Sequence, residues 1–358
     1  MCKKNTLLNI SNMRIELWGT YPPPIGGVSI HIYRLIHYLH EKDDSIILRN
    51  FGKTLPPFTY IKPLNNFWVE FVKLLFGSRR VIHLHSNNVL AFFLFILFGF
   101  RHRVGVTIHN KNLIKETSFV KKKVIKRFLR SSAFIILNDQ DYKDKLIESF
   151  QCESKHIFIL PAFFPPMKME YKGLSADIHN FRNNHAFVLS ANASKLRLEN
   201  NIDVYGLDLL IRLVKELKDE KVDVGLIFCL PAIGDVEYYN RCLSKIVDWG
   251  LENNILIVQK ELSNGFEVWK LSDLFIRPTS TDIEGISVKE ALFCGTLAIA
   301  SDVCVRPKEA ILFGNRNFED LKRKVWDCYM NRNILVKDKI YISDNTVDEI
   351  LNIYKSVM

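Results

Sequence analysis

Long hydrophobic runs are missing from this chain of 358 residues. The longest uninterrupted apolar run, residues 89–100, spans 12 residues, whereas a helix needs about 20 residues to cross the hydrocarbon of a membrane. The basic N-terminal stretch holds no apolar segment of signal-peptide length. We therefore expect no membrane-spanning helix and no secretion, and we place the protein in the cytoplasm.

Paired cysteines are missing as well. The seven cysteines are scattered, with no CxxC pair and no His/Cys cluster of zinc spacing. This pattern predicts reduced thiols rather than a disulfide framework or a structural zinc site. No GxGxxG motif follows the first predicted strand, at residues 14–18, which disfavours a dinucleotide-dependent dehydrogenase.

Positive charge is concentrated in the first half of the chain. Residues 1–180 hold 26 Lys and Arg against 13 Asp and Glu, and the remaining residues hold 23 against 26. With 48% hydrophobic residues, the length suits two domains of ordinary size. The charge difference indicates that the two halves meet different partners, the basic half being suited to an anionic surface or a polyanion.

Apolar strand patterns alternate with helical patterns along nearly the whole chain. Such alternation predicts parallel, doubly wound α/β sheets. A proline-rich, weakly periodic stretch near residues 163–183 predicts a linker between two such domains. The predicted strands are 14–18, 45–49, 81–85, 103–109, 134–137, 157–160, 186–190, 224–228, 255–258, 274–277 and 297–301.

A polar loop between the last two of these strands carries paired acids. Asp282 and Glu290 bracket the start of a predicted helix. The unpaired backbone N–H groups near Gly285, Ile286 and Ser287 can receive phosphate oxygens at that helix N-terminus. The loop therefore predicts a site that holds phosphate and hydroxyl groups together.

Two features of the first half also fall just beyond predicted strands. Gly26 and Gly27 follow three prolines and precede a helix, so a ligand can approach the backbone there. His109 ends an apolar strand, and ligands of open α/β sheets collect beyond the carboxyl ends of the strands. His85 and His31 are assigned either a structural or a ligand-facing role.

These stretches resemble the retaining glycosyltransferases of family 4, also called group 1, which have the GT-B fold. Residues 282–290 (DIEGISVKE) resemble the point where that family usually carries two glutamates eight residues apart. Residues 19–36 (GTYPPPIGGVSIHIYRLI) resemble its first βα loop. Residues 106–110 (VTIHN) look like its histidine-bearing strand, and residues 205–217 (YGLDLLIRLVKEL) like the first helix of its second domain.

The resemblance implies an α/β protein of GT-B fold, with two doubly wound Rossmann-like domains facing each other across a cleft. Residues 1–170 would form the acceptor domain and residues 171–343 the nucleotide-sugar donor domain. In this family a C-terminal helix, here residues 344–358, packs back on the first domain.

The resemblance also implies roles for the acids and the histidine. Asp282 occupies the position of the first glutamate, which contacts hydroxyls of the transferred sugar, and Glu284 is the alternative carboxylate. Glu290 would accept hydrogen bonds from the ribose hydroxyls. His109 would donate to the donor sugar.

The implied phosphate-binding groups are the Gly26–Gly27 pair, the amides of residues 285–287 and a cation. Family members usually supply an arginine and a lysine after the first strand of the second domain, but Tyr205 stands in place of that lysine. Lys195 and Arg197 are the nearest cations, and either could clamp the diphosphate.

The implied activity is transfer of a sugar, with retention, from a nucleotide-sugar to a glycan acceptor. The family suggests a lipid-linked acceptor in the biosynthesis of capsule, lipopolysaccharide O-antigen or exopolysaccharide. Neither a metal nor another cofactor is expected, and no enzyme nucleophile is evident.

A basic amphipathic segment, residues 119–132, favours peripheral contact with the inner face of the plasma membrane over a merely solvated basic helix. The rivals are a nucleotide-sugar epimerase of the same fold and a nucleic-acid-binding protein. The paired acids of the second half argue against nucleic acid as a partner.

Overall fold

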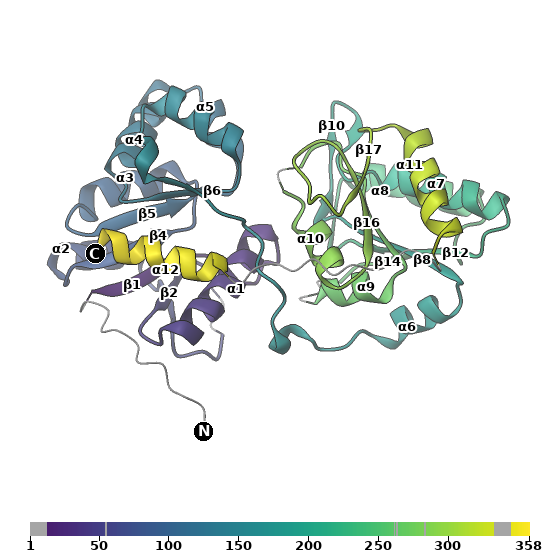
Figure 1. Ribbon diagram of the computed structural model, residues 1–358, viewed down its shortest axis with the longest axis horizontal. Coiled ribbons are helices and arrows are strands. Elements are labelled where there is room, and N and C mark those ends of the chain that lie inside the picture. The colour runs from purple at the N-terminus through teal and green to yellow at the C-terminus, as the bar shows by residue number, and fades with distance from the viewer. Residues whose placement is uncertain (1–12, 54–55, 261, 263, 283, 333–344) are drawn as a thin grey trace. The chain divides into compact units, whose positions relative to one another are not determined.

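The computed structural model describes residues 13–53, 56–260, 262, 264–282, 284–332 and 345–358. The chain divides into two compact units. Unit 1 holds the described residues up to Phe164 together with the C-terminal helix, and unit 2 holds those from Pro165 to Arg332 (Figure 1). Each unit is a parallel sheet between two layers of helices, which confirms the predicted pair of doubly wound, Rossmann-like α/β domains.

The sheet of unit 1 has seven parallel strands in the order β3-β2-β1-β4-β5-β6-β7. Its central strands are buried on both faces, as expected for strands covered by helices on either side. The strands are β1 (Arg14–Gly19), β2 (Ile47–Asn50), β3 (Ile61–Pro63), β4 (Arg80–Leu84), β5 (Arg103–Thr107), β6 (Ile135–Leu137) and β7 (Ile157–Ile159).

Alternate side chains of these strands enter two separate cores. Ile15 and Leu17 pack with helices α1 (Gly27–Lys42) and α12 (Asn345–Val357). Trp18, on the opposite face, packs with the remaining helices. Those helices are α2 (Phe67–Phe76), α3 (Val89–Phe98), α4 (Phe119–Ser131) and α5 (Gln140–Phe150), and a short 3₁₀ turn, η1 (Lys111–Lys115), adjoins them.

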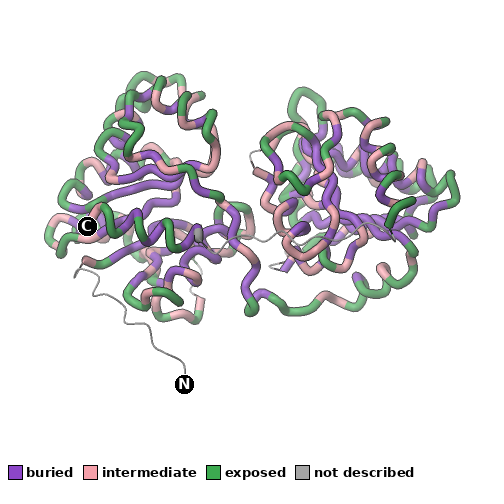
Figure 2. Tube along the Cα trace, in the orientation of Figure 1, coloured by how far each residue is buried: buried purple, intermediate pink, exposed green. Residues whose placement is uncertain are grey.

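The main sheet of unit 2 has six parallel strands in the order β14-β12-β8-β15-β16-β17. Figure 2 shows these strands buried inside the unit while the helices around them turn an exposed side outward. The strands are β8 (Phe187–Asn192), β12 (Val224–Cys229), β14 (Ile255–Val258), β15 (Leu274–Arg277), β16 (Leu297–Ser301) and β17 (Ile311–Phe313).

One face of this sheet packs against α7 (Leu207–Asp219), α8 (Val236–Asp248) and α11 (Phe318–Met330). The other face packs against α6 (Ala176–Asn183), α9 (Gly265–Leu271) and α10 (Ile286–Phe293). Helix α6 corrects the predicted linker, because the later part of that stretch is helical and buries Ile178 in the core.

Short elements complete the two units. Two small two-stranded sheets join β9 (Lys195–Leu196) to β13 (Ala232–Gly234) and β10 (Leu198–Glu199) to β11 (Ile202–Asp203). The 3₁₀ turns η2 (Ser154–His156) and η3 (Lys168–Glu170) flank β7 and the start of unit 2.

No helix within the described ranges is both long enough and apolar enough to cross a bilayer. The six cysteines that the structure describes are all free thiols. Burial raises the pKa of Cys229 to about 12 and that of Cys328 to about 11, so both remain protonated at neutral pH.

A buried hydrogen-bonded chain fastens α12 to the sheet of unit 1. The Tyr354 hydroxyl lies 2.6 Å from His83 Nδ1, and His83 Nε2 lies 2.7 Å from Thr107 Oγ1. Tyr354 and His83 are both fully buried. Burial lowers the pKa of His83 to about 3, so its imidazole is neutral and exchanges one donor and one acceptor with the two hydroxyl groups.

We predict that Tyr354→Phe lowers the free energy of unfolding by about 1–3 kcal/mol, because it leaves a ring nitrogen of His83 buried without its partner. Urea unfolding of unit 1 measures the loss. The control is Lys355→Ala, at an exposed position of the same helix, which should change stability by less than about 0.5 kcal/mol. Equal stability of the Tyr354→Phe variant and the parent protein would contradict this anchoring role.

Candidate functional site

The order of the strands reverses once in each main sheet. In unit 1 the reversal lies between β1 and β4, and in unit 2 it lies between β8 and β15. Loops beyond the carboxyl ends of two such strands diverge to opposite faces and leave a crevice, which is where ligands of open α/β sheets bind. The residues singled out from the sequence are therefore described at these two edges, one unit at a time.

The loop after β1 leaves open space at Gly26. This residue is the N-cap of α1, and its amide donates to Ser29 Oγ over 2.9 Å, while that hydroxyl donates to the Pro24 carbonyl over 2.6 Å. The φ of Gly26 is −164°, which is extended backbone open to any residue. A methyl group placed there would meet no atom within 4 Å. The packing of the protein therefore does not itself demand glycine, and Gly27 begins the helix directly beside this space.

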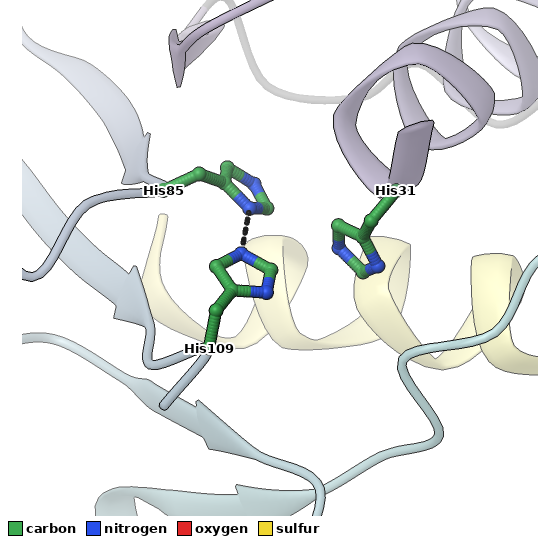
Figure 3. A group of neighbouring side chains, drawn as sticks. All are labelled: His31, His85 and His109. Carbon is green, nitrogen blue, oxygen red and sulfur yellow. Dashed lines mark hydrogen bonds between the residues drawn. The ribbon is translucent and has the colours of Figure 1, made fainter. Parts of the chain in front are cut away.

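Three histidines meet at the same edge of unit 1 (Figure 3). Strand β5 ends at Thr107, so His109 lies in the following loop rather than in the strand as predicted. Its Nε2 shares a hydrogen bond of 3.1 Å with Nδ1 of His85, which follows β4. The ring of His31, on α1, faces this pair with centroid separations of 4.8 Å to His109 and 5.4 Å to His85.

The rings of His85 and His109 carry no charge at neutral pH. Burial, reinforced by the neighbouring histidines, holds the pKa of His85 and of His109 well below the ordinary value. Each neutral ring offers one donor and one acceptor, which suits it to hydroxyl groups of a sugar. The structure thus gives His85 and His31, whose roles the sequence left open, a place beside His109.

In unit 2, Asp282 is held between two arginines. Its Oδ2 accepts from Arg277 Nε over 3.1 Å and from Arg306 Nη1 over 3.0 Å. Only 13% of the Asp282 side chain is exposed. Burial alone would raise the pKa of this carboxyl, but the two guanidinium groups outweigh burial and hold the pKa well below its usual range. Asp282 is therefore ionised and oriented at neutral pH.

Both arginines also bind the surrounding backbone. Arg277 Nη1 donates to the carbonyl and the side-chain oxygen of Asn192, which ends β8, and so bridges the two strands at the reversal. Arg306 is fully buried at its side chain and donates to the Ser301 carbonyl over 3.1 Å. The pair forms a fixed cationic wall at the carboxyl edge of the sheet.

Helix α10 begins beside this wall without a side-chain cap. Its N-cap, Gly285, has a φ of +66° in the left-handed region, and an added Cβ would lie 2.2 Å from Arg306 Nη1. Glycine is therefore required here both for the backbone conformation and for the close approach of the arginine. The amides of Ile286 and Ser287 lie in the first turn, where α-helices have N–H groups without intrahelical acceptors.

The other two acids of this loop have protein partners as well. Glu284 forms an ion pair with Lys289, and Glu290 Oε2 accepts from the indole Nε1 of Trp269 over 3.2 Å. The indole fixes Glu290 on the first turns of α10, close to the uncapped helix end. Both carboxylates are half-buried and lie on the same loop and helix as Asp282.

The cations predicted from the sequence make no hydrogen bond or ion pair with Asp282 among the described residues. Lys195 and Arg197 are exposed, and Arg197 pairs with Glu199 at 2.9 Å. Sequence reasoning missed Arg277 and Arg306 as the cations that contact Asp282. A signal for Arg277 was present, because a charged residue ending a buried strand marks the carboxyl edge, whereas Arg306 lies in a loop 24 residues beyond Asp282 with no motif around it.

Comparison with known proteins bears on the fold. A scan of protein-family models gives no match, and no curated protein matches significantly. Among solved structures, the chain is similar to HepE of Anabaena in complex with UDP, with a TM-score of 0.69 and 16% identity over 96% of this chain and 98% of that chain. It is equally similar to a glycosyltransferase from Rickettsia africae, with a TM-score of 0.69 and 16% identity over 97% and 99% of the two chains.

Sucrose-phosphate synthase from Thermosynechococcus elongatus is also similar, with a TM-score of 0.62 and 14% identity over 96% of each chain. These likenesses span nearly the full length of every chain compared. They show that the two units together have the GT-B fold.

Proposed function

We propose that the protein is a retaining glycosyltransferase that uses a nucleotide-sugar donor. The observation that carries this proposal is the edge of unit 2, where an uncapped helix N-terminus, two fixed arginines and three carboxylates surround the reversal of strand order. A nucleoside diphosphate sugar needs positive potential for its phosphates and acceptors for its hydroxyls, and this edge offers both. HepE, similar in fold, has been solved with UDP-glucose, so a UDP-sugar is the first donor to test.

The helix end suits the departing diphosphate. Amides in the first turn of α10 carry partial positive charge from the helix dipole. Arg277 and Arg306 are fixed cations beside this helix end, and both pair with Asp282. Preorganised donors of this kind stabilise charge that develops as a bond to phosphate breaks, and they act without reorganisation at that moment.

The acids suit the sugar and the ribose. Glu290, held by Trp269, accepts from the ribose hydroxyls in this proposal. Asp282 or Glu284 accepts from hydroxyls of the transferred sugar, and the fixed orientation of Asp282 favours it for recognition at a single hydroxyl. The proposal needs no metal, because amides and guanidinium groups carry the phosphate charge.

In the transfer itself, the bond between the anomeric carbon and the diphosphate oxygen breaks, and a bond from that carbon to the acceptor oxygen forms on the same face. The proton of the acceptor hydroxyl passes to the departing diphosphate oxygen. His109, neutral and half-buried, donates to a hydroxyl of the sugar. No enzyme group is acylated or glycosylated in this scheme.

We assign acceptor binding to unit 1 and propose a lipid-linked glycan of a surface polysaccharide as the acceptor. Support comes from a broad surface formed by α2, α3 and α4, which we call the apolar–basic face. Its exposed large apolar residues are Trp68, Val69, Val72, Phe76, Leu90, Phe93, Leu97, Phe100, Phe119 and Val120. Helix α3 lies beside both α2 and α4, and exposed large apolar residues gathered on neighbouring helices are typical of an interaction surface.

Basic residues accompany these apolar side chains. A pocket of about 550 Å³ beside α2 is lined by Trp68 and Phe76. Its cations Lys73 and Arg80 pair with the acids Glu70 and Glu16 of the same pocket.

On α4, the exposed Phe119 and Val120 are followed by the exposed Lys122 and Lys123. Exposed apolar side chains beside cations match a bilayer surface that carries anionic headgroups. We therefore propose that unit 1 docks peripherally on the cytoplasmic leaflet.

The first prediction concerns the donor. Among UDP, GDP and ADP, and their sugars, at least one should raise the melting temperature, because a ligand at about 100 times its dissociation constant adds about 2.7 kcal/mol of stability. Glu290→Gln should raise the dissociation constant of that ligand at least about tenfold and so reduce the thermal shift. The substitution removes the charge of the side chain but keeps an oxygen that can accept from Trp269. Glu237→Gln, an exposed acid of α8, is the matched control. Identical donor affinity in both variants would contradict the site.

A second prediction tests whether Gly26 is needed for ligand binding rather than for folding. Gly26→Ala should leave the melting temperature unchanged, because its methyl group meets no protein atom. The same methyl group should lower kcat/KM for sugar transfer at least about tenfold by filling the space a ligand needs. The control is Gly173→Ala, at another position where an added methyl group meets no atom within 4 Å. Because the φ of Gly173 is positive, this variant should lose some stability, but it should keep its activity. Full activity of Gly26→Ala would show that the loop does not contact a ligand during transfer.

A third prediction concerns the apolar–basic face. The protein should float with vesicles containing phosphatidylglycerol and not with vesicles of phosphatidylcholine alone, and added salt should weaken this binding. The double variant Trp68→Ser, Phe76→Ser should bind the vesicles less favourably by at least about 2 kcal/mol, which lowers the partition coefficient roughly 30-fold. Val236→Ser with Val247→Ser, exposed on α8 of unit 2, should have no effect. Unchanged flotation of the Trp68/Phe76 variant would exclude this face.

A further inference from the structure

The histidines at the edge of unit 1 form a cluster with the geometry of a metal site. One ring nitrogen from each of His31, His85 and His109 can be chosen so that all three lie within 4.8 Å of one another. Figure 3 shows the three rings converging from α1, from the end of β4 and from the loop after β5. Three imidazoles from three separate elements meet here although they are far apart in sequence.

The surroundings of each ring fit a ligand role. His31 Nδ1 lies 2.6 Å from the Ala162 carbonyl, so it is the protonated nitrogen and Nε2 carries the lone pair. Metal-bound histidines commonly donate their other nitrogen to a backbone carbonyl in this way, which fixes the tautomer and the ring orientation. The contact also ties the cluster to the end of unit 1, because Ala162 follows β7.

His85 supplies an independent indication. The residue is 97% buried, and within the described part of the chain its Nε2 has no hydrogen-bond partner. A buried ring nitrogen without a partner is costly, and a bound ion is one of the explanations such an atom calls for. The His85 Nδ1 contact to His109 uses only one side of the ring.

We propose that His31, His85 and His109 bind a divalent transition metal, with Zn²⁺ the expected ion. Nitrogen-only ligands exclude Mg²⁺ and Ca²⁺, which require oxygen, and three histidines with one exchangeable position form a known Zn²⁺ coordination pattern. Zinc bonds of 2.0–2.1 Å place tetrahedral ligands roughly 3.3 Å apart, so binding draws the rings inward by small side-chain rotations.

Metal binding and the proposed transfer compete for His109. A bound ion occupies the ring that would otherwise serve the donor sugar, so Zn²⁺ should inhibit a transferase of the proposed kind. This consequence rests on the proposed function, whereas metal binding does not. The two are separable, because binding is measured without any sugar donor.

The test titrates metal-free full-length protein with Co²⁺ and with Zn²⁺. One Co²⁺ per chain should give the intense visible absorption of a low-coordinate histidine site without the near-ultraviolet band of thiolate ligation, and one equivalent of Zn²⁺ should abolish it. His31→Ala and His85→Ala should each weaken Zn²⁺ binding, measured against a chromophoric chelator, by at least the roughly 100-fold that loss of a supporting partner can cause.

The matched control is His40→Ala, on the same helix as His31 but stacked on Tyr60 outside the cluster, and it should bind as the parent does. Circular dichroism of each metal-free variant checks folding. Should His85→Ala fail to fold, His109→Ala, at a half-buried loop position, carries the same comparison. A featureless Co²⁺ spectrum, or Zn²⁺ affinity unchanged in the folded cluster variants, would overturn the proposal and leave the cluster a stacked core of neutral histidines.

Discussion

The reversal of strand order in each parallel sheet is the constraint on which both candidate sites depend. Right-handed crossovers carry the chain after β1 into α1 on one face of unit 1 and after β4 into α3 on the other. In unit 2 the chain after β8 enters α7 and the chain after β15 enters α10, again on opposite faces. The loops must separate at these points, so backbone amides and strand-end side chains are left available to ligands there.

The charge cluster of unit 2 shows how such an edge can be held open. Removing Asp282 and two guanidinium groups from water is costly, and the cost is offset only where every donor and acceptor is satisfied. Arg306 meets that condition through Ser301, and Arg277 through Asn192. These contacts fix the orientation of Asp282 and of both guanidinium groups beside the start of α10.

Much of this architecture could be predicted from the sequence, because hydrophobic periodicity reports burial directly. The predicted strands 255–258, 274–277 and 297–301 agree with the structure to the residue. Strands β3 and β17 were not predicted, and β3, with the sequence IKP, has no apolar run for a hydrophobic pattern to detect. The residues of helix α6 were assigned to a linker because the stretch is proline-rich and weakly periodic, and packing of Ile178 against the sheet makes the helix part of the core.

The residues of the candidate sites also differ in whether a local sequence pattern reveals them. The loop around Gly285 could be found because its signal is local, a glycine beside a helix start with acids on either side. Arg306 could not, since its contact with Asp282 joins loops that follow two different strands. Pairings of that kind depend on sheet order, which a single sequence does not display.

The histidine cluster lies between these cases, and its origin can be traced to the alternation of side chains. Side chains two apart on a strand point to one face, so His83 and His85 share the side of β4 that α1 and α12 cover. Their rings are 4.1 Å apart. His31 lies one turn before Leu35, whose side chain is buried in that same core, so it reaches the carboxyl edge of the sheet. The sequence VIHLHS shows the two histidines of β4 directly. Their neighbour His31 can be identified only from the fold, because the crossover after β1 places α1 on the same face of the sheet.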